Sequence, residues 1–278
     1  MTFQLKAWGL EQYAGQWILS YCGGPEVSVR LYARGSINER AGSDPRRIAS
    51  QVSGEFRGFA LSSPRQVHGR TVIIAEKASC LPVRPEADGL FMWRTDIAGS
   101  LQFADCVPVI LYGRVPYNWL ALGHSGFAGT GKNMVSAMLS NVLEICGPGS
   151  LEGVVAWVGP GICRECYGRK FEDPSTRWGR KVFPGEYVIL KKEMVYFDLP
   201  GMIEQQLLDL GIPKSAVSRI PYCTRCRNDI FYSCRAGDMR RNVLFARIIS
   251  RGHKDNHSGE NNCSGPRFSA IPILECDH

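Results

Sequence analysis

Three side chains of this sequence, two imidazoles and a thiol, can bind a metal or attack a carbon atom. Cys106 precedes an apolar run at 107–112, and His124 follows a second run at 119–122. Glycine and proline between the runs indicate a turn, so the runs are predicted to form an antiparallel hairpin. A turn centred on residue 115 pairs positions whose numbers sum to 230, as 106 and 124 do. The spacing therefore predicts Cys106 opposite His124, with Cβ atoms about 5 Å apart.

His68 lies in a turn-rich segment before another predicted strand. If it joins the pair, His68, Cys106 and His124 form a set of three ligands with a fourth position open, which is typical of catalytic zinc. The hairpin alone also fits a buried apolar thiol beside a structural histidine.

A glycine-rich segment, residues 126–132, follows His124. It resembles a phosphate-binding P-loop that ends at Lys132, but Asn133 replaces the Ser or Thr that would bind magnesium. Glycines that lead into a helix can present backbone N–H groups to an anion. The same glycines can also serve only to allow close packing, and the sequence leaves both interpretations open.

The composition is that of a globular protein. The 278 residues are 44% hydrophobic and 21% charged, and the net charge of +7 favours anionic ligands. No basic recognition helix, membrane-spanning run or signal peptide is recognisable, so we expect a cytoplasmic protein that binds neither nucleic acid nor membranes. No protein partner is evident.

Strands and helices are predicted without a regular βαβ alternation, which favours an α+β fold with a mixed sheet and flanking helices. Helices are expected to begin at Pro45, capped by Asp44, to cover 134–143, and to follow Asp198. The predicted strands are 27–32, 71–75, 107–112, 119–122, 154–158 and 243–249. Residues 1–250 are expected to form one catalytic domain, and the polar segment 251–278 a flexible tail.

Eleven cysteines are present, and four of them form two Cys-x₂-Cys pairs, at 163 and 166 and at 223 and 226. Such pairs can build a Cys₄ zinc site. The 167–222 segment between them is much longer than the spacing in a zinc ribbon. The spacing therefore argues against a shared site.

Several short motifs, taken together and in order, resemble one family over residues 15–250. They are QVHG (66–69), EADGL (86–90), FADCVPVILYG (103–113), GHSGFAG (123–129), VGPGI (158–162), CY (166–167), CT (223–224) and FYSCR (231–235). This family is known as the multicopper polyphenol oxidoreductase, or laccase-domain, family. The resemblance implies a single α+β domain related to bacterial toxin deamidases. That relationship also suggests an alternative function, a metal-free Cys–His hydrolase with Cys106 as the nucleophile and His124 as its base.

The resemblance also implies a function and a site. Family members are regarded as zinc-dependent purine nucleoside phosphorylases that act on adenosine, inosine and methylthioadenosine and can deaminate adenosine. Carried over, the zinc ligands are His68, Cys106 and His124. Asp105, next to Cys106, is expected to orient a ligand or relay a proton, or simply to cap a turn. The implied partners are a purine nucleoside and phosphate.

The substrate side of the site is predicted with one departure from the family pattern. Residues expected to contact nucleoside or phosphate are Gln66, Ser125, Gly126, Lys132 and Arg235. Where the family has HAGWRG, this chain has HSGFAG, so Phe127 replaces Trp and Ala128 replaces Arg. The loss of that guanidinium is expected to weaken phosphorolysis.

The histidine count argues against the copper chemistry in the family's older name. A multicopper oxidase needs many imidazoles, and this chain has five histidines and no His-x-His pair. A single Cu²⁺ bound in vitro at the His₂Cys site is still compatible with the sequence, because copper outcompetes zinc in raw affinity.

Overall fold

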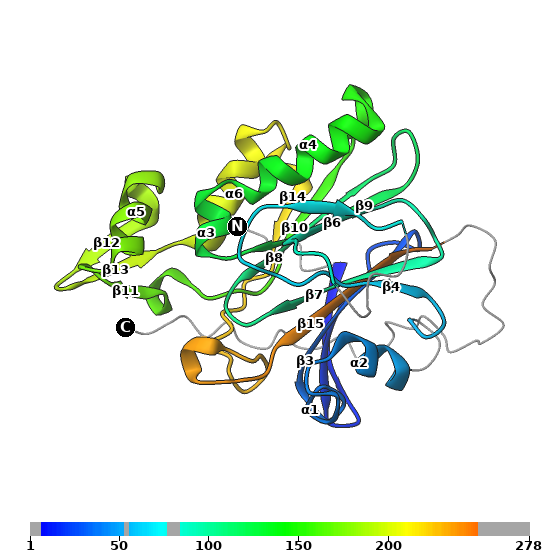
Figure 1. Cartoon of the computed structure of the whole chain (residues 1–278), viewed down its shortest axis with the longest axis horizontal. Coiled ribbons are helices and arrows are strands. Elements are labelled where there is room, and N and C mark those ends of the chain that lie inside the picture. Colours follow the sequence, from blue (N-terminus) through cyan, green and yellow to red (C-terminus); the bar gives the residue numbers. More distant parts are fainter. Residues whose placement is uncertain (1–6, 53–55, 77–83, 250–278) are drawn as a thin grey trace.

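The computed structural model describes residues 7–52, 56–76 and 84–249 (Figure 1). Two six-stranded sheets form its centre, and a three-stranded sheet projects from one end. The predicted tail, residues 251–278, lies outside the described residues. Within the described ranges, no helix is both long and apolar enough to cross a membrane.

The two central sheets are mixed. In spatial order, the first contains β1 (Trp8–Tyr13), β2 (Gln16–Tyr21), β3 (Val27–Gly35), β15 (Asn242–Ile248), β7 (Ile97–Phe103) and β4 (Ala60–Ser62). The second contains β14 (Val217–Arg219), β10 (Val155–Val158), β8 (Val107–Gly113), β9 (Trp119–Ser125), β6 (Gly89–Met92) and β5 (Val72–Ile74). Most neighbours are antiparallel, whereas β4–β7, β5–β6 and β10–β14 are parallel. The predicted α+β class with a mixed sheet is confirmed.

Helices cover the two outer faces. The described helices are α1 (Ser36–Ala41), α2 (Pro45–Gln51), α3 (Phe127–Gly131), α4 (Met134–Cys146), α5 (Pro174–Val182) and α6 (Leu199–Asp209). In Figure 1, α4 and α6 lie over the second sheet, and α1 and α2 lie on the opposite side, against the first. The three predicted helices correspond to α2, α4 and α6, and the Asp44 side chain caps α2 by accepting from the Arg46 N–H.

The strands of the hairpin are buried on both faces, which explains their nearly continuous apolar sequence. In β8, Val109 and Leu111 face the helices α4 and α6, whereas Ile110 faces the first sheet. In β9, Ala121 and Leu122 alternate in the same way. A charged side chain at any of these positions would be buried and would disrupt the close packing on both faces. Because of this packing, the hairpin is a rigid base for the residues at its open end.

The hairpin exists as predicted, but its predicted register is wrong. Pro108 lies opposite His124 and Gly113 opposite Trp119, so paired numbers sum to 232 rather than 230. The reason is that the loop, residues 114–118, is centred one residue later than expected. Because an even shift of the sum preserves the alternation of faces, Cys106 and His124 remain on one face as diagonal neighbours.

An arm extends from the end of the molecule that carries the candidate site. It consists of β11 (Gly168–Lys170), β13 (Met194–Phe197) and β12 (Val188–Lys191), with α5 beside them (Figure 1). Phe197 from this arm packs on Phe127 of α3, with ring centroids 4.9 Å apart. The arm therefore joins the core directly beside the glycine-rich segment.

Candidate metal centre

Three predicted ligands converge from three separate segments. His68 lies in the loop before β5, Cys106 directly precedes β8, and His124 belongs to β9. Their ligand atoms, one from each side chain, all lie within 4.8 Å of one another. His68 is exposed, Cys106 is partly buried and His124 is buried. The group is thus open to solvent on one side only, as a centre that must admit a substrate requires.

Asp88 holds two of the ligands in place. Its carboxylate oxygen Oδ1 lies 2.8 Å from His124 Nδ1, which leaves the other imidazole nitrogen, Nε2, as the candidate metal-binding atom. The same carboxylate accepts the backbone N–H groups of Val67, His68 and Gly69 at 2.7–3.2 Å. These bonds stabilise the loop although His68 has the left-handed φ of 58°.

We expect Asp88→Asn to weaken zinc binding by about 10- to 100-fold, the usual effect of removing a group that orients a metal ligand. In asparagine an NH₂ group replaces one carboxylate oxygen, and this hydrogen-bond donor would face N–H groups that now donate to that oxygen. Zinc affinity measured by competition with a chelating indicator checks this. Asp96→Asn, at an exposed aspartate paired with Arg94, is the matched control and should keep its affinity. An unchanged affinity in Asp88→Asn would contradict the role given to Asp88.

Cys106 and His124 form a charge pair when no metal is bound. Burial alone would raise the pKa of the Cys106 thiol, but the charges and hydrogen bonds of His124 and His68 outweigh it and lower the pKa to about 6. Burial would lower the pKa of His124, but Cys106 and Asp88 raise it to about 9. Cys106 is therefore a thiolate near neutral pH, the form in which cysteine binds metals and attacks electrophiles.

Asp105, predicted as a catalytic residue, is buried beside the ligand Cys106. Its Oδ1 accepts the hydroxyls of Thr224 and Ser233 at 2.8 and 2.6 Å, and its Oδ2 accepts the Arg235 N–H at 2.7 Å. Its own backbone has a φ of 84°. These contacts fix the turn that leads into Cys106. A proton-relay role for Asp105 stays a prediction.

The glycine-rich segment packs against the ligands. A Cβ added to Gly126 would lie 2.6 Å from Cys106 Sγ, and one added to Gly131 would lie 2.5 Å from the Trp178 ring. The segment folds into the short helix α3, and the following helix α4 is capped by its own Asn133 side chain, which accepts from Ser136 N–H at 2.9 Å. Close packing therefore accounts for glycine at positions 126 and 131.

The predicted substrate residues have different surroundings. The Gln66 side chain exchanges two 2.8 Å hydrogen bonds with the backbone of Gln102 in β7 and so anchors the His68 loop. Ser125 is buried and hydrogen-bonds Thr130 at 2.9 Å. Lys132 is exposed at the end of α3. Of the predicted set, Gly126 contacts the metal ligands most directly.

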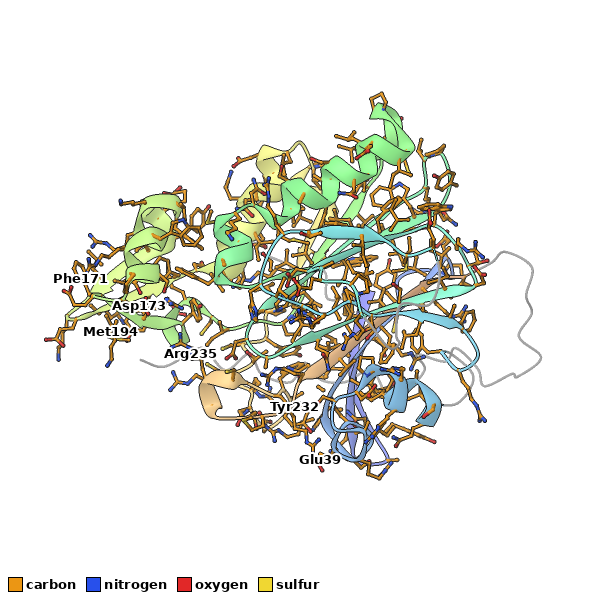
Figure 2. All side chains as sticks on the ribbon, in the orientation of Figure 1. Glu39, Phe171, Asp173, Met194, Tyr232 and Arg235 are labelled. Atoms are coloured by element: carbon orange, nitrogen blue, oxygen red, sulfur yellow. The ribbon has the colours of Figure 1, made fainter. Side chains whose placement is uncertain are left out.

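Arg235 belongs to a group of cations that sequence reasoning did not assemble. Its guanidinium lies 4.8 Å from the centre of the Tyr167 ring and donates to the Gly168 carbonyl at 2.6 Å. Arg169 donates to the Tyr167 hydroxyl at 3.2 Å and lies over the Phe127 ring. In Figure 2, Arg235 lies close to the arm, in agreement with its bond to Gly168 of β11. Two guanidiniums thus flank Tyr167. Burial raises the pKa of its hydroxyl, and the positive charges of Arg169 and Arg235 oppose that rise.

Comparison with known proteins identifies a family and several relatives. The sequence profile of a family described as multi-copper polyphenol oxidoreductase laccase matches residues 25–249. A Rickettsia conorii protein named purine nucleoside phosphorylase is 28% identical over 166 residues, 58% of this chain and 65% of that protein. A Streptomyces coelicolor protein of the same name is 25% identical over 210 residues, 74% of this chain and 84% of that protein. The alignment with the rickettsial relative thus spans less than two thirds of its length.

Solved structures share the fold. The hypothetical protein YfiH from Bacillus licheniformis superposes with a TM-score of 0.73 at 19% identity, over 86% of this chain and 98% of YfiH. YlmD from Geobacillus stearothermophilus superposes with a TM-score of 0.71 at 22% identity, over 87% of this chain and 99% of YlmD. With a profile match that covers most of the chain and a fold shared almost end to end, the protein belongs to the multi-copper polyphenol oxidoreductase laccase family.

Proposed function

We propose that this protein is a zinc-dependent purine nucleoside phosphorylase. The observation that carries the proposal is the convergence of His68, Cys106 and His124 within 4.8 Å, in a family whose relatives from Rickettsia and Streptomyces are named purine nucleoside phosphorylases. The proposed substrates are a purine nucleoside, such as adenosine, inosine or methylthioadenosine, and phosphate. The proposed products are the free purine and ribose 1-phosphate.

The donor set fits zinc better than magnesium or a multicopper cluster. Two imidazoles and one thiolate are ligands that Zn²⁺ prefers, whereas Mg²⁺ takes oxygen ligands. Three protein ligands leave one position open for substrate or solvent. When bound, the metal would act as a Lewis acid toward an oxygen atom in that position.

The chain's own residues suit the demands of phosphorolysis. In this reaction a phosphate oxygen forms a bond to C1′, the bond from C1′ to the purine nitrogen breaks, and the purine keeps the electron pair and takes up a proton. The phosphate dianion must be held near C1′ by cationic groups. Arg235 is the cation proposed for this role, because its backbone N–H donates to Asp105, next to Cys106, and its guanidinium lies 4.8 Å from the centre of the Tyr167 ring. Arg169, on the other side of Tyr167, is a second cation, and it also pairs with Asp173 at 3.4 Å.

The two activities implied by the family resemblance can be separated by their products. Incubating adenosine with the purified protein and phosphate should give adenine and ribose 1-phosphate, whereas deamination would give inosine without any need for phosphate. Chromatography of the reaction with and without phosphate distinguishes them. If neither adenine nor inosine is formed from adenosine, and inosine and methylthioadenosine are also untouched, the proposed function is wrong.

A second candidate, a metal-free Cys–His hydrolase, is favoured by one observation, the low pKa of Cys106 beside His124. We expect metal-stripped protein to react with iodoacetamide at Cys106 with a rate that rises with pH around a midpoint near 6, because only the thiolate reacts. Mass spectrometry of the labelled peptide gives this rate. Zinc bound to the thiolate should suppress the labelling. A zinc-loaded protein that is labelled as fast as the stripped one would favour the hydrolase.

A further inference from the structure

The structure brings the two Cys-x₂-Cys pairs together, although the long segment between them argued against it. Cys163 and Cys166 follow β10, and Cys223 and Cys226 follow β14. Strands β10 and β14 are parallel neighbours, so their carboxyl ends lie at the same edge of the sheet. We refer to these four residues as the cysteine cluster. Its four sulfur atoms all lie within 4.8 Å of one another.

From this geometry we propose that the cysteine cluster is a second metal site, a closed structural zinc centre separate from the His₂Cys centre. A tetrahedral ZnS₄ unit with bonds of about 2.3 Å has sulfur–sulfur edges of roughly 3.8 Å. The sulfurs of Cys166 and Cys226 are 3.4 Å apart, and none of the four cysteines is in a disulfide. The sulfurs are thus spaced as ligands around one ion.

Backbone groups around the cluster support thiolate ligands. The N–H groups of Cys163 and Cys226 both point at Cys223 Sγ, with nitrogen–sulfur distances of 3.2 and 3.4 Å. Such bonds stabilise a negative sulfur and orient metal ligands. The Cys226 bond lies within one Cys-x₂-Cys turn, and the Cys163 bond joins the two turns.

The surroundings of the cluster favour a closed site over a reactive one. Cys166 and Cys223 are buried, and the cluster packs against the main apolar core, next to the fully buried Ile162. Four sulfur ligands complete a tetrahedron and leave no position for a substrate, which is the pattern of structural zinc. Arg225, inside the second turn, adds a positive charge that offsets part of the negative charge of a zinc ion with four thiolates, whereas Arg164 in the first turn is paired with Glu165 at 3.4 Å.

Two hydrogen bonds to Asp105 connect the cysteine cluster with the His₂Cys centre. Thr224 lies between Cys223 and Cys226, and its hydroxyl donates to Asp105 Oδ1 at 2.8 Å. The Ile162 N–H, adjacent to Cys163, donates to the Asp105 carbonyl at 2.9 Å. Asp105 in turn fixes Cys106. An ion in the cysteine cluster would therefore fix the segments that contain Ile162 and Thr224. These two residues hydrogen-bond Asp105, which precedes Cys106 of the His₂Cys centre.

Metal analysis of the full chain tests the proposal independently of any nucleoside chemistry. Protein purified under reducing conditions should contain two zinc ions per chain by mass spectrometry of the metal. Cys106→Ala and the double variant C163S/C226S should each contain one, and the combination of all three substitutions none. Cys234→Ala, at an exposed cysteine outside both sites, is the control and should retain two.

Cobalt substitution tests the cluster without altering it. Cys106→Ala leaves the four cysteines intact, so its cobalt form should show the intense thiolate-to-cobalt charge-transfer and tetrahedral ligand-field bands of a four-sulfur site. This readout holds even if C163S/C226S fails to fold. A wild type with one zinc ion, lost in Cys106→Ala, would overturn the proposal. So would a thiol titration of the denatured, unreduced protein showing that the four cysteines are paired as disulfides.

Discussion

Cys106→Ala should lower kcat/KM for phosphorolysis by more than about 100-fold, because it removes a metal ligand and not merely a group that orients one. The fold should persist. Cys106 lies at the open end of the hairpin, where it is only partly buried and packs against the core, and alanine is close to it in size. Steady-state kinetics with inosine and phosphate, together with circular dichroism, measures both effects.

The matched control for this variant is Cys234→Ala, at the exposed cysteine near Arg235. It should retain full activity and the same zinc content at the His₂Cys centre. If Cys106→Ala keeps most of its turnover, zinc bound by His68, Cys106 and His124 does not drive the reaction in this chain.

Arg235→Ala should raise the KM for phosphate by roughly 10- to 150-fold, which corresponds to about 1.5–3 kcal/mol for a hydrogen bond to a charged group. The guanidinium is already positioned beside Tyr167 by its bond to the Gly168 carbonyl. Deamination of adenosine does not use phosphate and should be much less affected. Initial rates at varied phosphate, with adenosine as the nucleoside, separate the two reactions.

Two further variants test the role of Arg235 in phosphate binding more specifically. Arg177→Ala, at an exposed arginine on α5 whose side chain contacts Glu172, should leave the phosphate KM unchanged. Ala128→Arg restores the residue of the family motif and should improve phosphorolysis relative to deamination. If Arg235→Ala uses phosphate as well as the wild type, the phosphate is held elsewhere, and the role given to Arg235 is wrong.

The parts of the fold that repeat a local pattern were predictable. The helix α4 follows from one apolar stripe bounded by Asn133 and Gly147, and β8 and β9 follow from two apolar runs around a turn. The register was not predictable to one residue, because the loop at 114–118 can centre at more than one position.

Features that depend on distant contacts were missed. Asp88 lies just before the buried strand β6, and its importance comes from partners 19 to 36 residues away. Its signal was present, since a charged residue just before a buried strand must find partners. The arm β11–β13 gave no such signal, because its strands are three or four residues long and partly exposed.

The residues of the candidate sites differ in the same way, between those linked by local patterns and those linked only by distant contacts. His68, Cys106 and His124 were predicted as a group because the hairpin and the family motifs both pointed to them. The convergence of the cysteine cluster was not predicted, because it depends on the parallel pairing of β10 with β14, and the 159–216 segment lies between those strands. Long-range parallel pairing leaves no short-range trace in a sequence.

The most direct test of the central claim is the formation of ribose 1-phosphate from inosine before metal removal, after it, and after zinc is added back. The wild type should require both phosphate and metal, and zinc should restore the activity of the stripped protein. His68→Ala should stay inactive after the same zinc addition, because one of its three ligands is missing. Turnover that survives complete removal of metal, or that His68→Ala retains, would contradict a catalytic metal centre at His68, Cys106 and His124.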